Sequence, residues 1–174
     1  MKKPTLILIV ALITFVNAKA QKHIGSKFTG NEATVYDNKD FVKTQFKKIV
    51  IQSGSQDIKT DKKIISEYKD LNVIKVSWLE LFPPVKEYSD DDIKNKLQAN
   101  EIDGWIKITV KSKSNRLLDK EGDMELSVIS TKDNVKAVKC IGRTTIGMYS
   151  GLLAPEKTIL KFVRLTYDDV KKYF

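Results

Sequence analysis

The spacing of hydrophobic and polar positions from residue 41 onward predicts a regular order of strands and helices. The run "FKKIVIQ" predicts a short strand. After the turn "SGSQDIKTD", the helical spacing of Ile64, Ile65 and Tyr68 predicts a helix over residues 62–69. "NVIKVSWLELF" then predicts a second strand, and because both of its faces are apolar it is typical of a sheet inside an α/β domain.

The stretch "LFPPVKEYSDDDIKNKLQANEIDGWIKITV" separates that strand from the next. Pro83 and Pro84 lack an amide donor, so the second strand is expected to end near Phe82. Ser89 predicts a helix N-cap, with the acids 90–92 in the first turn facing the positive end of the helix dipole. The alternative is a cation site, but the ligand spacing of a calcium loop is absent and capping accounts for the acids. "WIKITVK" predicts a third strand.

Two further strand patterns, residues 124–131 and 135–146, are joined by the short link "KDN" and predict an antiparallel hairpin. The polar segment "KSKSNRLLDKEGD" before them predicts a loop. Pro155 predicts the start of an amphipathic closing helix. The expected fold class is therefore α/β, a single domain whose mixed sheet combines a βαβαβ unit with an antiparallel β-hairpin and a C-terminal helix.

The first twenty residues have the pattern of a secretory signal peptide. Lys2 and Lys3 precede an apolar run over residues 6–16, and small residues lead to a predicted cut after Ala20. A membrane anchor is the alternative, but this run would give a helix of roughly 17 Å against a hydrocarbon core of about 30 Å. We therefore expect an exported chain that begins at Gln21 and has no transmembrane segment. Its expected location is the periplasm or the cell exterior, with peripheral association with the outer membrane as a further alternative.

Domain organisation follows from the remaining pattern. Residues 21–40 show no sustained periodicity and predict a flexible lead-in, and residues 41–174 predict the single domain. Removing residues 1–20 takes away three lysines and no acid, so the formal charge falls from +9 to +6. Cys140 is the only cysteine, so no intrachain disulfide can form, and its strand-like surroundings predict a buried side chain rather than a reactive thiol.

The residue types present exclude several chemistries. His23 is the only histidine, which removes a Ser-His-Asp triad, a Cys-His pair and a zinc site built from several histidines. The sequence thus predicts no catalytic residue, no metal and no cofactor. A small hydrolase without histidine, using a Ser/Lys pair or two carboxylates, stays open as the alternative. The basic residues are mostly lysines, and with only Arg116, Arg143 and Arg164 for bidentate phosphate contacts we expect no nucleic-acid partner.

The order of "FKKIVI", "VSWLELFPPVKEYSDDDIKNKL" and "ANEIDGWIKITV" resembles small envelope-associated α/β domains of Gram-negative bacteria, related to the amino-terminal domain of the TolB translocation protein and to the curli-secretion lipoprotein. The resemblance covers residues 41–110, and "IDG" before an apolar run introduces a strand in such domains. It implies a periplasmic accessory role and carries no catalytic residue. Residue 21 is not a cysteine, so the lipid anchor and the pore of the secretion lipoproteins are not implied here.

The sequence therefore favours a non-catalytic exported protein that binds an envelope protein or a wall component. Ligands of open α/β sheets collect at the carboxyl ends of the strands, so we expect any binding surface at that edge. For the two aromatic candidates, Trp78 and Phe82, the alternative is burial in the core. The candidate binding residues are Trp78, Phe82, Pro83, Lys111, Lys113 and Arg116.

Overall fold

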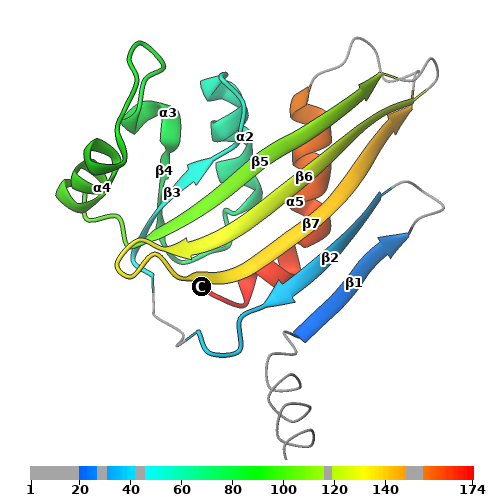
Figure 1. Ribbon diagram of the computed structural model, residues 1–174, viewed down its shortest axis with the longest axis horizontal. Helices are drawn as coiled ribbons and strands as arrows, with labels where there is room; N and C mark the ends of the chain where they lie inside the picture. Colours follow the sequence, from blue (N-terminus) through cyan, green and yellow to red (C-terminus); the bar gives the residue numbers. More distant parts are fainter. Residues whose placement is uncertain (1–19, 27–30, 42–45, 116–118, 148–154) are drawn as a thin grey trace, which may run out of the picture.

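The computed structural model describes residues 20–26, 31–41, 46–115, 119–147 and 155–174, which build one seven-stranded mixed sheet with helices packed on it (Figure 1). The strands are β1 (Ala20–Ser26), β2 (Asn31–Asp37), β3 (Lys48–Gln52), β4 (Ile74–Ser77), β5 (Gly104–Asn115), β6 (Asp119–Ser130) and β7 (Lys136–Gly147). The helices are α2 (Ile58–Glu67), α3 (Trp78–Leu81), α4 (Asp90–Ala99) and α5 (Pro155–Lys171). The strand order is β1-β2-β7-β6-β5-β3-β4, which confirms the expected fold class.

The parallel part of the sheet is the predicted βαβαβ unit. Strand β3 lies between β4 and β5 and is parallel to both. Helix α2 begins four residues earlier than predicted, because the Asp57 side chain caps it by accepting from the Lys59 N–H at 3.0 Å. Ser89 caps α4 as predicted, in a capping box with Asp92.

The predicted end of the second strand is wrong. Strand β4 stops at Ser77, and the chain then makes the helical turn α3, closed by a hydrogen bond of 2.7 Å from the Phe82 N–H to the Trp78 carbonyl. The prolines do not end the strand, because it has already ended. Alternation of apolar residues cannot separate a strand from one helical turn over so short a run.

The antiparallel part is larger than the sequence predicts. Strands β6 and β7 pair as the expected hairpin, and β5 pairs with β6 along its length. Most of the polar segment predicted as a loop belongs to β5 and β6 instead, since β5 continues to Asn115 and β6 begins at Asp119. A strand segment with polar residues on both faces has no apolar side for a sequence pattern to reveal.

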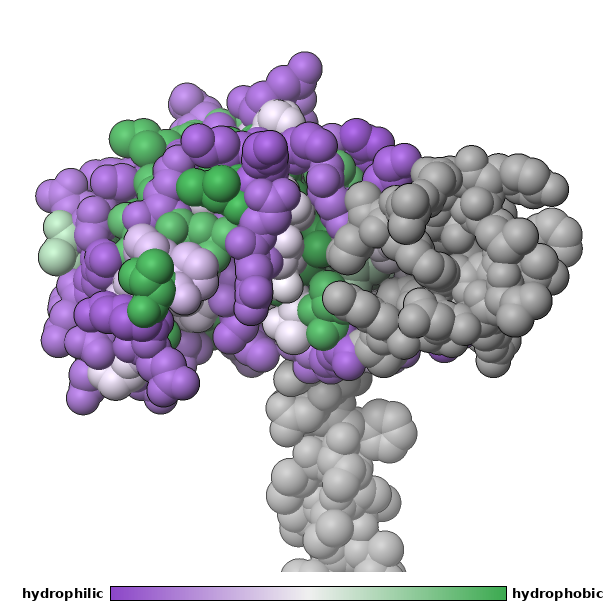
Figure 2. Space-filling model, turned by 90° about the horizontal axis from the view of Figure 1, so that it is seen from above, coloured by the Kyte–Doolittle hydropathy of each residue, from purple (hydrophilic) through white to green (hydrophobic). Residues whose placement is uncertain are grey.

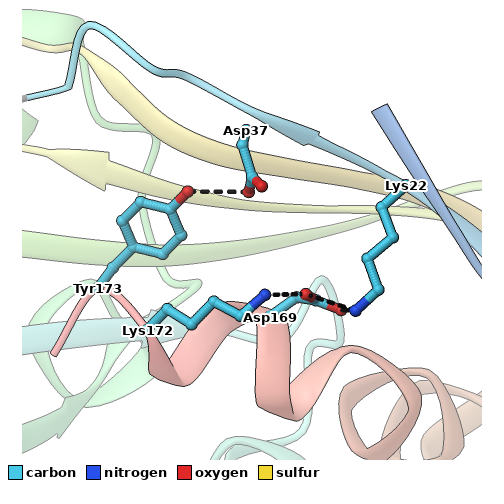
Figure 3. Close-up of polar contacts among 5 residues, drawn as sticks. All are labelled: Lys22, Asp37, Asp169, Lys172 and Tyr173. Carbon is cyan, nitrogen blue, oxygen red and sulfur yellow. Dashed lines mark hydrogen bonds and ion pairs between the residues drawn. The ribbon is translucent and has the colours of Figure 1, made fainter. Parts of the chain in front are cut away.

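The predicted flexible lead-in also needs correction, because β1 and β2 lie inside it and extend the sheet beyond β7. Ala33 and Val35 of β2 are buried in the main core. Polar contacts fix both strands to the end of α5 (Figure 3): the Lys22 ammonium lies 3.0 Å from the Asp169 carboxylate, and the Tyr173 hydroxyl donates to Asp37 at 2.9 Å. Contacts that depend on residues so distant in sequence are not visible in a local pattern.

Two hydrophobic clusters lie on opposite faces of the sheet. The main core fills the space between the sheet and helices α2 and α5, which lie together on one face (Figure 1). Cys140 is buried there as predicted, and burial raises the pKa of its thiol to about 12, so the thiol stays protonated. The second cluster packs α3 and α4 against β3 and β4 on the other face, around Val50, Phe82, Leu97 and Ile102.

Candidate functional site: the open face of the sheet

The face of the sheet opposite α5 is uncovered over its antiparallel half. Side chains alternate along each strand, and those of β1, β2, β5, β6 and β7 that point into the main core leave their neighbours on the other face. Among the described residues, α3 and α4 cover that face over β3, β4 and the start of β5, where Trp105 packs on Trp78. The side chains of this open face are Gln21, His23, Glu32, Thr34, Tyr36, Trp105, Lys107, Thr109, Lys111, Asp123, Glu125, Ser127, Ile129, Lys136, Lys139, Ile141 and Arg143.

Three lysines surround one carboxylate at the centre of the open face. The Glu125 carboxylate lies 2.7 Å from the Lys111 ammonium, 3.5 Å from that of Lys139 and 3.7 Å from that of Lys136. The three lysines come from β5 and β7, which flank Glu125 on β6. We call Lys111, Lys136 and Lys139 the lysine cluster.

The lysine cluster controls the charge of Glu125. Burial raises the pKa of this carboxyl group, while the hydrogen bond from Lys111 and the charges of Lys139, Lys111 and Lys136 lower it, and the balance leaves it below its usual value. Glu125 is therefore ionised at neutral pH. Three ammonium groups then face one carboxylate, and the centre of the open face carries more positive than negative charge.

A hollow of about 450 Å³ opens beside the lysine cluster, where β2 and β7 meet the connection after β2. Tyr36, Ile141 and two residues of the lysine cluster, Lys136 and Lys139, line it, so the hollow combines apolar and basic residues. Its lining residues are Tyr36, Asp37, Asn38, Lys136, Val138, Lys139 and Ile141.

An aromatic cluster lies where the open face meets α3. The rings of Trp78 and Trp105 are stacked with centroids 4.9 Å apart, and the Lys107 ammonium lies 4.9 Å from the centroid of the Trp105 ring. Phe82 packs on Trp78 at 4.2 Å. The stacking on Trp78 and the contact with Lys107 both engage the Trp105 ring, so it does not offer the bare aromatic platform on which sugar rings stack.

The sequence predicts a binding surface at the carboxyl edge of the parallel strands. In the structure, the Asp61 side chain links the strand ends at this edge. This side chain is fully buried and accepts three hydrogen bonds: from the Ser77 hydroxyl at 2.7 Å and from the N–H groups of Ser53 and Leu79 at 3.2 Å each. Figure 2 looks down on this edge, and its described surface is largely hydrophilic with small separate hydrophobic groups. Asp61 therefore ties the ends of β3 and β4 to α2 and is occupied by internal donors.

The structure brings Trp78, Phe82 and Pro83 together and places Lys111 apart from them. Phe82 is 2% exposed and belongs to the second cluster, which settles its alternative in favour of the core. Trp78 and Pro83 are half-buried beside it. Lys111 lies on the open face against Glu125. The side chain of Lys113 and the whole of Arg116 lie outside the described residues.

Sequence reasoning missed both Glu125 and Asp61, although each has a signal. In "MELSVIS", Glu125 alternates with core residues and so belongs to the opposite face of the strand. Asp61 precedes Ile64 by three positions and Tyr68 by seven, which places it on the buried side of α2. A polar residue at an apolar helix position indicates a buried polar contact.

The described residues were compared with the requirements of a metal site and of a membrane span. The described residues contain no group of three or more His, Cys, Asp or Glu side chains arranged to hold a metal ion. His23 lies on β1 of the sheet, with its Nε2 atom 3.5 Å from the Glu32 carboxylate. Within the described part of the chain, no helix is long and apolar enough to cross a membrane.

No protein-family model matches the chain, and no curated protein sequence matches it. Some solved structures are similar to it at low identity. The PelC dodecamer from Paraburkholderia phytofirmans is 9% identical with a TM-score of 0.45, over 75% of this chain and 93% of that one. A point variant of that dodecamer gives 8% identity and a TM-score of 0.48, over 75% and 95%. Lipoprotein GNA1162 from Neisseria meningitidis is 14% identical with a TM-score of 0.40, over 72% and 99%.

Likenesses this weak carry no conclusion about ligand or partner, so the function is argued from the residues of this chain. The resemblance to the TolB amino-terminal domain stays a prediction.

Proposed function

We propose that the chain is an exported, non-catalytic protein of the cell envelope that binds a partner through the open face of its sheet. The observation that carries the proposal is the open face itself, which spans five strands and which the described helices leave uncovered except at Trp105, where α3 packs on its edge. Sheets normally bury at least one face, and a second face with ordered, partly exposed side chains is available for a partner.

The acids of the described residues support a binding role over catalysis. Asp61 and Asp169 are the buried ones, and internal donors occupy both: Asp61 has three hydrogen bonds, and Asp169 is held between the ammonium groups of Lys22 and Lys172. A general acid or base needs an atom within reach of a substrate. No described residue favours the hydrolase alternative over binding.

Export predicts a defined mature terminus. Protein purified from the envelope fraction of its native host should begin at Gln21, because the Ala18 and Ala20 pattern directs cleavage after Ala20. Intact-mass spectrometry measures this directly. A cytosolic species that keeps Met1 would contradict the localisation.

The partner is tested by crosslinking in the exporting cell. A photo-crosslinking amino acid at Thr109, exposed on the open face, should yield a discrete crosslinked species. The same amino acid at Lys161, exposed on α5 over the opposite face, serves as the matched control and should yield none. Crosslinks from Lys161 alone, or from neither position in properly exported protein, would overturn binding through the open face.

A further inference from the structure

We infer that the open face binds an acidic polypeptide segment, whose carboxylates take the place that Glu125 now holds within the lysine cluster. The inference rests on the proposed function and names the chemistry of its partner. It follows from the charge, the shape and the aromatic residues of the open face.

Charge requires an anionic partner. Glu125 neutralises only part of the lysine cluster, whose ammonium groups lie at 2.7, 3.5 and 3.7 Å from a single carboxylate. The lysine side chains stay 35 to 51% exposed, while that of Glu125 is 15% exposed. The lysine side chains are therefore more exposed than the carboxylate side chain that they surround, so an incoming carboxylate meets an attractive surface.

Glu125 also shows which anion fits. A carboxylate on a flexible side chain already contacts all three lysines, so carboxylates of Glu or Asp side chains match the geometry that is present. Because Glu125 competes for the same ammonium groups, it acts as an internal substitute for the partner. Removing its charge should strengthen binding, which is the opposite of what a direct contact residue would show.

Shape and surface chemistry select a polypeptide among the anionic polymers. Helix α4 stands on the same side of the sheet as the open face, so a broad flat lipid surface is held off on that side. An acidic glycan would gain from a bare aromatic platform, but the Trp105 ring is already engaged by Trp78 and by Lys107. The hollow beside Tyr36 and Ile141 instead suits an apolar side chain within an acidic segment.

The test measures binding of fluorophore-labelled poly-L-glutamate to the mature chain by anisotropy. Each lysine–carboxylate contact near the surface is individually weak, so the double variant Lys111→Gln with Lys139→Gln, which removes two of them, should weaken binding by roughly threefold or more. Glu125→Gln should tighten it by roughly two- to fivefold. Raising the salt concentration from about 0.05 M to about 0.5 M should weaken binding of poly-L-glutamate to the wild type. The Debye screening length is about 10 Å at about 0.1 M salt and becomes shorter as the salt concentration rises.

The matched control is Glu67→Gln, which changes the net charge as Glu125→Gln does. Glu67 lies on α2 over the opposite face, where it pairs with Arg164 at 2.6 Å. The Glu67→Gln variant should bind poly-L-glutamate with an affinity within about twofold of the wild type. An equal gain from both variants would show a response to net charge alone and would overturn the lysine cluster as the site.

Two further probes decide the class of partner. Polygalacturonate carries carboxylates on a sugar chain, and phosphatidylglycerol vesicles carry phosphates on a membrane. Lysine-dependent binding of either probe as tight as that of poly-L-glutamate would overturn the polypeptide assignment. The lysine variants alter exposed side chains and should keep the wild-type melting temperature, so loss of binding cannot be attributed to unfolding. Crosslinking from Thr109 without poly-L-glutamate binding would refute this inference while the proposed function stands.

Discussion

Replacing Asp61 with alanine is expected to lower the free energy of unfolding by about 3 to 5 kcal/mol, because two backbone N–H groups and one hydroxyl lose their acceptor at a cost of about 1 to 3 kcal/mol per buried group. The donors are the N–H groups of Ser53 and Leu79 and the Ser77 hydroxyl. The total stability of a domain is about 5 to 15 kcal/mol, so the variant should lose a large share of its stability. Urea denaturation followed by circular dichroism measures the change.

Asp57→Ala is the matched control for Asp61→Ala. Asp57 lies at the start of the same helix and also accepts a hydrogen bond, from the Lys59 N–H at 3.0 Å, but it is exposed. Loss of such a cap costs about 1 kcal/mol. The loss of stability in Asp61→Asn should lie between those of Asp61→Ala and Asp57→Ala, because the asparagine side chain keeps one acceptor oxygen but replaces the other with a donor NH2 group. If Asp61→Ala is no more damaging than Asp57→Ala, the three hydrogen bonds do not hold the strand ends together.

The parallel half of the fold was accessible to sequence reasoning because its signals are local. Apolar runs of strand length and the helix capped by Ser89 follow each other within residues 48–110. Each is read from a few neighbouring residues, and the connection rules then leave few topologies. The closing helix was accessible for the same reason, since Pro155 and the apolar stripe after it are both local.

The antiparallel half was less accessible because its signals are distant. Strands β1 and β2 have the polar composition of a lead-in. Strand β2 pairs with β7, more than a hundred residues later, and β1 pairs with β2. The lysine cluster brings together Lys111 of β5, Glu125 of β6, and Lys136 and Lys139 of β7. Alternation along one strand gives the face on which each side chain lies, but only the pairing of β5, β6 and β7 places the four side chains next to one another. No local pattern specifies that register, so the sequence did not predict the cluster.

The position of Phe82 shows why an aromatic residue next to two prolines was a misleading sign of a binding surface. Sequence reasoning placed it at the end of a strand, where ligands collect. The helical turn α3 after Ser77 instead directs Phe82 beneath α4, against Trp78 and Tyr88. Phe82 is therefore a core residue of the second cluster and not part of a binding surface.

Replacing Phe82 with alanine is expected to lower the free energy of unfolding by about 3 to 5 kcal/mol, as for other large-to-small changes of a buried aromatic residue. The ring is 2% exposed, and its centroid lies 4.2 Å from that of Trp78 and 5.1 Å from that of Tyr88. Its loss leaves a cavity under α4, and Trp78 loses its stacking partner. Urea denaturation monitored by tryptophan fluorescence should report both the lower stability and an altered native emission.

Val85→Ala is the matched control, three residues further along the same segment. Val85 is 87% exposed, so its truncation should change stability by less than about 0.5 kcal/mol. Phe82→Leu restores part of the lost volume and should recover part of the stability without restoring the stacking on Trp78. A folded Phe82→Leu protein should still give the Thr109 crosslink, because Phe82 supports α4 and does not contact the partner. Wild-type stability in Phe82→Ala combined with loss of that crosslink would instead make Phe82 a binding residue and move the site from the open face to the strand ends.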